Sequence, residues 1–243
     1  MMKKLFEKSE IWFAVMWIII YVVGFSTADS ISESIGIPKL VTAIFALAMS
    51  AVLFGFVKKN DLTAYFGLCG MEGSSRKYLY FLPLILISSV NFWNGVSCNG
   101  SAVEAILFVI SMLCVGLLEE LIFRGFLFRA MCQDNVKTAI VVSSLTFGFG
   151  HIVNLFRGEA LAETLIQLIY ASAIGFCFTV LFYVSKSIIP CIIAHAVVNS
   201  TSMFCMDGNW TMFLISTAVI TVVGVAYGVY LLRSVKKDES DPA

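Results

Sequence analysis

The chain has 243 residues, of which 59% are hydrophobic and 13% carry a charged side chain, and its mean hydropathy is +0.92. A soluble domain carries about 25% charged residues, so this composition excludes an ordinary soluble protein and indicates a polytopic membrane protein. Acidic and basic residues balance to a net charge of zero. No basic run is longer than the pair Lys236-Lys237, so the sequence gives no reason to expect nucleic-acid binding.

The first apolar segment follows Lys3, Lys4 and Lys8 and ends in Ser-Thr-Ala, as the core of a cleaved signal peptide could. Its apolar run from Ile11 to Phe25 is long for a signal peptide, however, and the small-residue site is poor. We therefore interpret this segment as a retained first span.

Eight apolar segments can be marked along the chain, each near the ~20 residues that a bilayer requires. They are 10–28, 39–57, 78–97, 102–131, 137–156, 161–184, 187–205 and 210–232. The fourth is long enough for its last turns to leave the bilayer. No internal repeat or proline-rich linker interrupts the series. The sequence thus predicts an all-α, polytopic membrane helix bundle of about eight transmembrane helices, built as a single integral-membrane domain over residues 1–243.

The basic residues are distributed unevenly between the two ends of these segments. With a cytoplasmic N-terminus and eight crossings, all sixteen fall on the cytoplasmic side except Lys39 and Arg157. The positive-inside rule predicts this bias for an even number of spans. We therefore expect a multi-pass protein of the cell membrane, with both termini, the 58–77 loop and the 132–137 turn in the cytoplasm.

Two carboxylates and a guanidinium interrupt the fourth segment, in the stretch Glu119-Glu120-Leu-Ile-Phe-Arg124. A charged side chain at the centre of a bilayer costs roughly 2.5–3.5 kcal/mol even on lenient scales, so such residues are rarely idle. Residues four apart share one helix face, so Glu120 and Arg124 can pair. Glu119 points about a quarter turn away and is left free. An ion pair that merely locks two helices is the alternative.

The chain contains two histidines, His151 and His195, and each lies inside a predicted span. Asn199 follows His195 on the same helix face. A single buried histidine is usually an interhelical hydrogen bond, but both histidines here accompany the paired intramembrane glutamates. At 1.5 Å per residue, Glu119, His151 and His195 lie about 20, 21 and 12 Å from the cytoplasmic ends of their spans. We expect them to meet below the membrane surface in a site that opens toward the cytoplasm.

Such a set of residues could hydrolyse a peptide in either of two ways. A carboxylate in an apolar site can act as general base toward water, while a histidine and an amide stabilise the developing oxyanion. Alternatively, Glu119, His151 and His195 could hold a catalytic zinc with water as its fourth ligand. The His-Glu-x-x-His and Gly-x-Ser-x-Gly motifs are absent. Gly148 and Gly150 could admit a substrate backbone or simply a packed helix.

Three motifs on successive spans carry a family resemblance: Glu119-Glu120-x-x-x-Arg124, Phe147-x-x-x-His151 and His195-x-x-x-Asn199. In this order they resemble the motifs of the CAAX-processing and bacteriocin-processing (CPBP, or Abi) intramembrane proteases, over about residues 102–202. The chain looks more like the prokaryotic branch of this family, by length and span count. The resemblance implies that Glu119 with His151 activates water and that His195 and Asn199 stabilise the oxyanion, with Glu120 and Arg124 as a supporting pair.

The resemblance implies a membrane-associated peptide or protein as substrate, met in the lipid bilayer, and leaves open whether a divalent metal such as zinc takes part. It does not separate peptide maturation from self-immunity to bacteriocins. Two other classes of function stay open. One is a catalytically idle protein that binds a membrane peptide or confers bacteriocin immunity. The other is a transporter or proton pathway, which would favour inverted repeats that the sequence does not show.

Overall fold

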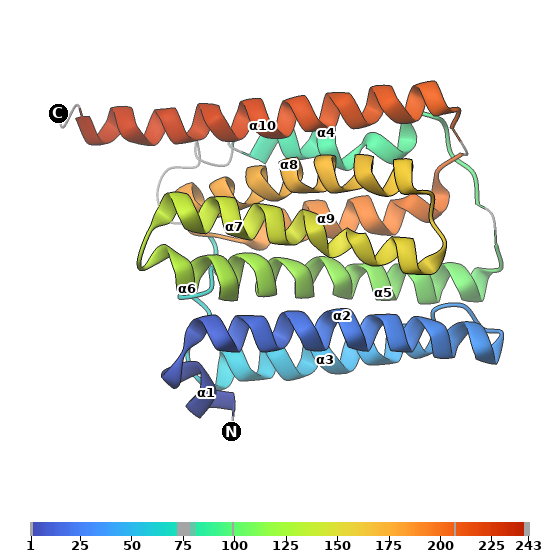
Figure 1. Ribbon diagram of the computed structural model, residues 1–243, viewed down its shortest axis with the longest axis horizontal. Helices are drawn as coiled ribbons and strands as arrows, with labels where there is room; N and C mark the ends of the chain where they lie inside the picture. Colours follow the sequence, from blue (N-terminus) through green and yellow to red (C-terminus); the bar gives the residue numbers. More distant parts are fainter. Residues whose placement is uncertain (1, 72–78, 80, 99, 207, 241–243) are drawn as a thin grey trace.

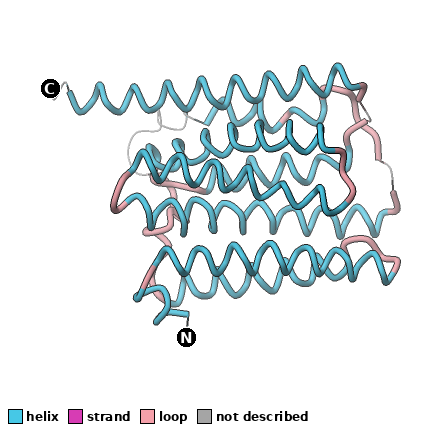
Figure 2. The backbone as a smooth tube through the Cα atoms, in the orientation of Figure 1, coloured by secondary structure: helices cyan, strands magenta, loops and turns pink. Residues whose placement is uncertain are grey.

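The computed structural model describes residues 2–71, 79, 81–98, 100–206 and 208–240, with side chains up to residue 234. The described residues are helical apart from short connections, and their one extended pairing is an isolated bridge between Val96 and Cys205 (Figure 2). The predicted all-α fold is confirmed.

Successive long helices run in opposite directions along one common axis (Figure 1). As a result α1 and the end of α10 lie at the same end of the bundle, as an even number of crossings requires. We call this the termini end and its counterpart the far end. In chain order the elements are α1 (Met2–Lys8), α2 (Glu10–Ile35), α3 (Leu40–Lys59), α4 (Leu82–Ser88), η2 (Val90–Phe92), α5 (Ala102–Glu120), η3 (Leu121–Phe128), α6 (Arg129–Cys132), α7 (Val136–Phe149), η4 (Gly150–Arg157), α8 (Leu161–Ser185), α9 (Ile189–Thr201), η5 (Ser202–Phe204) and α10 (Trp210–Ser240).

Within the described residues, six helices are long and apolar enough to cross a membrane, so this is a multi-pass membrane protein. They span Glu10–Ile35, Leu40–Lys59, Ala102–Cys132, Val136–Arg157, Leu161–Ser185 and Trp210–Ser234. The predicted count of about eight is therefore approximate. The helix Ile189–Phe204 is apolar but shorter, and the segment predicted at 78–97 contains only α4 and η2 among its described residues.

These two shorter elements pack against each other. Asn91 in η2 donates from Nδ2 to the Val198 carbonyl of α9, at 2.6 Å, and to Thr201 Oγ1, at 2.9 Å. The stretch from Asn91 to Gly95 therefore turns the chain, and its Asn91 amide holds α9, instead of extending a helix. That is why the apolar pattern alone predicted a longer span here.

Local signals fix several of the helix ends. Ser9 and Asn135 cap α2 and α7 by accepting hydrogen bonds from backbone N–H groups three residues on. Ser101 and Glu104 form a reciprocal capping box at the start of α5. Gly36 ends α2 at a φ of 79°, a left-handed conformation that favours glycine. The α2–α3 turn is thus tight, and it places Lys39 at the far end.

The centre of the bundle is η3, in which all eight residues are buried. It contacts α2, α5, α6, α7 and α8. At the termini end it meets a cluster of rings that we call the aromatic plug. Phe126 and Phe66 lie there with ring centroids 4.9 Å apart, and both side chains are fully buried. The plug consists of Phe6, Phe13, Phe56, Tyr65, Phe66 and Phe126.

Candidate active site

Glu120 and Arg124 form the ion pair that their spacing predicts. Arg124 Nη1 lies 3.0 Å from Glu120 Oε1, and both side chains are completely buried. The guanidinium also donates from Nη2 to the Gly175 carbonyl, at 3.2 Å, and lies 4.2 Å above the ring centre of Phe147. Charge, hydrogen bonding and a cation–π contact together stabilise the guanidinium where water is excluded.

The helix that carries this pair changes its winding at the pair. Leu121–Phe128 forms a π-helix, a rare conformation that is enriched at functional sites. The wider turn is supported from α7, where Ser143 Oγ donates to the Phe123 carbonyl at 2.9 Å. Because π turns rotate side chains away from α-helical positions, the contacts of this stretch across helices do not follow from spacing alone.

His195 lies between the two glutamates. Its Nδ1 is 2.8 Å from Glu120 Oε1 and its Nε2 is 3.6 Å from Glu119 Oε2. Glu120 already accepts from Arg124, so it is an anionic acceptor and Nδ1 of His195 carries the donated hydrogen. Glu120 therefore orients the histidine as well as balancing Arg124. The sequence motif indicated only the second of these roles.

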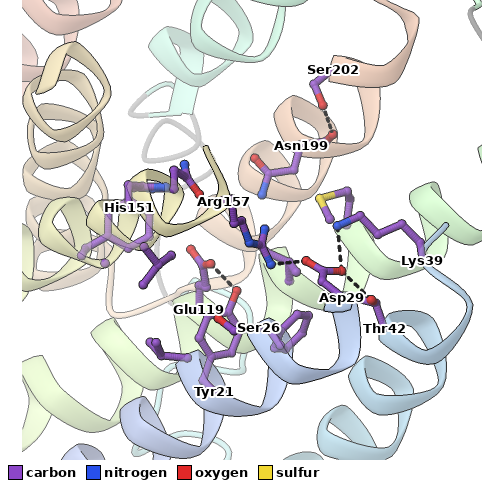
Figure 3. Close-up of a pocket in the computed structure, with 18 of the residues that line it drawn as sticks. Tyr21, Ser26, Asp29, Lys39, Thr42, Glu119, His151, Arg157, Asn199 and Ser202 are labelled. Carbon is purple, nitrogen blue, oxygen red and sulfur yellow. Dashed lines mark hydrogen bonds and ion pairs between the residues drawn. The ribbon is translucent and has the colours of Figure 1, made fainter. Parts of the chain in front are cut away.

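Glu119 faces a cavity instead of the dry core. This catalytic cavity, as we call it, has a volume of about 240 Å³ and is bordered by Glu119, His151 and Asn199, which come from three different helical segments (Figure 3). Tyr21 of α2 donates its hydroxyl hydrogen to Glu119 Oε1. The Glu119 side chain is 13% exposed whereas that of Glu120 is fully buried. The two neighbouring carboxylates thus occupy different environments.

The 3₁₀ winding of η4 explains how His151 reaches this cavity. With about three residues per turn, positions i, i+3 and i+6 line up on one side of the helix. His151, Asn154 and Arg157 have this spacing, and all three border the catalytic cavity. An α-helix over the same residues would have fanned them over about 120° of its circumference.

A short hydrogen-bond chain sets the protonation pattern of His151. Asn154 Nδ2 donates to Gln167 Oε1 at 2.8 Å, which leaves the Gln167 amide to donate to His151 Nδ1 at 3.3 Å. In this arrangement Nδ1 accepts, so the neutral ring carries its hydrogen on Nε2. His151 can therefore offer one N–H donor from Nε2.

A second cavity of about 110 Å³ is bordered by His151, His195 and Asn199. Each of the four residues predicted as catalytic therefore borders a cavity that includes His151. Glu119 and Asn199 share the first cavity with it, whereas His195 and Asn199 share the second. The structure thus places the four side chains around two cavities that share His151 and Asn199.

The catalytic cavity extends toward the far end of the bundle. There the Asp29 carboxylate binds Lys39 Nζ at 2.9 Å and also binds Arg157 and Thr42 (Figure 3). Lys39 and Arg157 are the two basic residues that the charge count places outside. The polar border of this cavity therefore lies at the end of the bundle opposite the termini, whereas the expectation placed the opening at the cytoplasmic end together with the termini.

The two glycines before His151 differ in their surroundings. A Cβ at Gly148 would lie 1.9 Å from Ser172 Oγ and 2.9 Å from the Leu168 carbonyl oxygen, so this glycine allows α7 to pack on α8. A Cβ at Gly150 would meet nothing within 4 Å. Gly148 thus fits the helix-packing alternative, and Gly150 has open space beside it.

The residues do not form a ready metal site. Among the described residues, no group of three or more His, Cys, Asp and Glu side chains is arranged to hold a metal ion. His195 uses Nδ1 toward Glu120, and His151 uses Nδ1 toward Gln167. Because Nδ1 of His151 accepts from Gln167, its Nε2 carries the hydrogen and the ring has no free lone pair for a zinc. Glu119, His151 and His195 therefore do not fit a zinc in this arrangement.

Several residues of the site were missed by the sequence reading. Tyr21 and Gln167 carry no motif signal, because a single tyrosine or glutamine in an apolar span is unremarkable. Asp29 and Arg157 gave a weak signal, since charges near the ends of apolar helices often have partners. The ion pair between them joins residues more than a hundred positions apart, so the sequence around either residue could not predict it.

Comparison with known proteins agrees with the placement of these motifs. The family model described as "Type II CAAX prenyl endopeptidase Rce1-like" matches residues 101–201, which include α5, η3, α7 and α9 with all three motifs. No curated protein and no solved structure shows a significant match to the chain. The matched family is one of proteases, so peptidase activity is the general function that the match supports. Over residues 101–201, the chain is thus similar to the type II CAAX prenyl endopeptidase Rce1-like family.

Proposed function

We propose that the protein is an intramembrane endopeptidase that hydrolyses a peptide bond in a membrane-associated protein or peptide. The observation that carries this proposal is the unequal environment of the two glutamates. Glu120 is bound by Arg124 and His195, whereas Glu119 borders a cavity together with His151 and Asn199. No arginine or lysine of the described residues is bonded to Glu119, so its carboxylate remains available to accept a proton from water.

The proposed reaction begins with water between Glu119 and His151. Glu119 removes a proton from the water while His151 Nε2–H holds its oxygen, which attacks the carbonyl carbon of the scissile bond. The carbonyl oxygen becomes an oxyanion, and the Asn199 amide donates to it. Glu119 then passes its proton to the leaving nitrogen. The products are a new carboxyl group and a new amine, so no further reactant is needed.

His195 completes this scheme as the second oxyanion donor. Its Nδ1–H is directed at Glu120, so it can donate through Nε2 only when the ring carries both hydrogens. In that form each ring nitrogen faces a carboxylate, since Nε2 is 3.6 Å from Glu119 Oε2. The distance exceeds a hydrogen bond and leaves Nε2 available to a reacting group.

We further propose that the chemistry needs no resident metal ion. The support is that Nδ1 of His151 accepts from Gln167, so its Nε2 carries the hydrogen and the ring has no free lone pair for a metal. Zinc content of the purified protein tests this directly. Zinc at one equivalent per chain, lost together with activity in Glu119→Gln, would overturn the metal-free scheme.

The far-end position of the polar border suggests the side from which substrate arrives. We propose that peptides reach the catalytic cavity from the end that carries Lys39 and Arg157, opposite to cytoplasmic termini. Reporter fusions after Lys77 and after Lys237 should both score as cytoplasmic. A single cysteine at position 157 in a cysteine-free chain should then react with an impermeant reagent added outside intact cells.

The decisive experiment is a cleavage assay with a quenched peptide library on the purified chain in detergent. Glu119→Gln and His151→Ala should each remove most of the activity, and the double variant should be little worse than either single one. Residues of one catalytic unit behave in this non-additive way. Additive losses would contradict a shared water-activating role.

An inert peptide-binding or bacteriocin-immunity protein would behave differently. The nearly isosteric Glu119→Gln would keep whatever phenotype the protein confers on its host, and neither form would cleave. Phenotype and cleavage should therefore be measured on the same variant at matched abundance. Retained phenotype without cleavage by the wild type would favour the binding function.

A further inference from the structure

Tyr21 is attached to the carboxylate that we propose as the general base. It lies near the middle of α2, stacks against Phe25 with ring centroids 4.5 Å apart, and donates its hydroxyl hydrogen to Glu119 Oε1 (Figure 3). Tyr21 also borders the catalytic cavity. Among the described residues, the polar partners of the Glu119 carboxylate are Tyr21 and His195.

We propose that Tyr21 is a positioning residue of the active site, an inference that rests on the proposed endopeptidase function. A general base must present one oxygen to water in a fixed direction. The Tyr21 hydroxyl holds Oε1, so that Oε2 stays on the side of the cavity and of His195. Without this bond the carboxylate could rotate about its last torsion angle, which is a soft one.

The chemistry of a phenol suits this task. A phenol donates one hydrogen bond and brings no positive charge, whereas a guanidinium or ammonium would form an ion pair with the base. Glu120 shows the contrast, because its partner Arg124 is a cation held at 3.0 Å. Tyr21 therefore orients Glu119 without balancing its charge.

The position of Tyr21 in the chain widens the site beyond the family match. Tyr21 belongs to α2, while the match covers residues 101–201. The helix α2 contacts η3, and Phe25, Asp29 and Tyr21 all border the cavity from it. The matched segment alone therefore supplies an incomplete site, and α2 provides most of its remaining wall together with one group that touches the base.

The chain offers a matched control at the termini end of the same helix. Tyr65 donates to Glu10 Oε2 at 2.7 Å, and Glu10 belongs to α2. This is a second tyrosine–glutamate pair that involves α2. This second pair lies away from both cavities that His151 borders. The Tyr65 hydroxyl also accepts from Gln133 Nε2 at 2.8 Å, so Tyr65→Phe removes a tyrosine–glutamate bond and one further bond, and it should still leave turnover unchanged.

The test compares Tyr21→Phe, Tyr65→Phe and Glu119→Gln with the wild type in steady-state cleavage of a peptide from the library. Tyr21→Phe should lower kcat by about 10–100-fold with KM within about twofold, because the lost bond holds a charged group during the reaction. Its profile of kcat against pH should also change, whereas that of Tyr65→Phe should coincide with the wild type.

Each outcome bears on a definite statement. Wild-type kcat in Tyr21→Phe, with Glu119→Gln inactive, would overturn the role of Tyr21 and leave the proposed function intact. A wild-type chain that cleaves nothing would overturn both. If Tyr21→Phe accumulates poorly, Tyr21→Gln and Tyr21→Met replace it, since they are similar in size and only Gln keeps a donor. Higher kcat in the Gln variant supports the proposal, and equal kcat overturns it.

Discussion

Two halves of one short stretch contrast sharply: the dry cluster around Glu120 and the catalytic cavity beside Glu119. The cluster is a fully buried network in which Glu120 binds Arg124 and His195. The cavity side offers Glu119 a phenol, a more distant imidazole and open volume. Adjacent carboxylates on one helix thus meet a dry, charge-paired environment and one that borders a cavity, because they point about 100° apart.

Environment, and not residue type, distinguishes the two carboxylates. Substitutions in the dry cluster should lower the stability of the protein, since leaving a buried charge without its partner is costly. Substitutions on the cavity side should lower turnover instead, since these groups can be changed without leaving a buried charge unpaired.

The largest expected effect is on the stability of the dry cluster. Arg124→Ala leaves Glu120 buried without its cationic partner, which should cost about 3–5 kcal/mol and lower the amount of protein in the membrane fraction. Glu119→Gln should accumulate normally. Arg129→Ala is the control, because Arg129 lies over the Tyr65 ring outside the cluster. Equal amounts of Arg124→Ala and wild type would contradict the contrast.

On the cavity side, Asn199→Ala should reduce turnover and leave accumulation unchanged. Removing one oxyanion donor costs about 100–1000-fold in kcat. Asn60→Ala, which changes the same residue type at the end of α3, should have wild-type kcat. The measurement is kcat at matched protein concentration. If Asn199→Ala lowers the amount of protein and leaves kcat unchanged, Asn199 supports the fold, as the dry cluster does.

A smaller effect is expected where α7 packs on α8 beside the dry cluster. Gly148→Ala forces a Cβ against Ser172 Oγ and the Leu168 carbonyl, which should destabilise the protein by about 1–3 kcal/mol. Gly150→Ala, two residues away, has open space and should not. Thermal unfolding in one detergent would compare the pair, and equal midpoints would argue against tight packing at Gly148.

The smallest effect is expected at the far end of the cavity. Asp29→Asn removes the anion between Lys39 and Arg157, but the Arg157 side chain is 42% exposed and water screens its charge. The expected change in stability is therefore about 1 kcal/mol or less. Thermal unfolding measures it, and a loss as large as that of Arg124→Ala would show that this end is as dry as the cluster.

The sequence predicted the elements of this site better than its connections. Glu119, His151, His195 and Asn199 do border common cavities, because apolar spans of similar length bring motifs to similar depths. The bond from Glu120 to His195 was missed, since side-chain direction across helices depends on packing and on the π winding of η3.

The span expected at 78–97 shows the limit of apolar patterns for the fold. Hydrophobicity measures whether a segment can enter lipid, and it does not report where the chain turns. The amide of Asn91 binds the Val198 carbonyl and Thr201 of α9, so polar pairing inside the protein shortens the helix. Such long-range partners are invisible in a local window.

The aromatic plug has a consequence for the membrane as an electrical barrier. Below the site, Phe66 and Phe126 are fully buried, and the Gly67 carbonyl accepts from the Ile188 N–H at 2.9 Å, which ties the loop to the turn before α9. Packed rings therefore fill the termini end of the bundle, opposite to the polar border of the cavity beside Glu119. A cell can keep ionisable groups in mid-membrane in this form without a leak that would discharge its ion gradient.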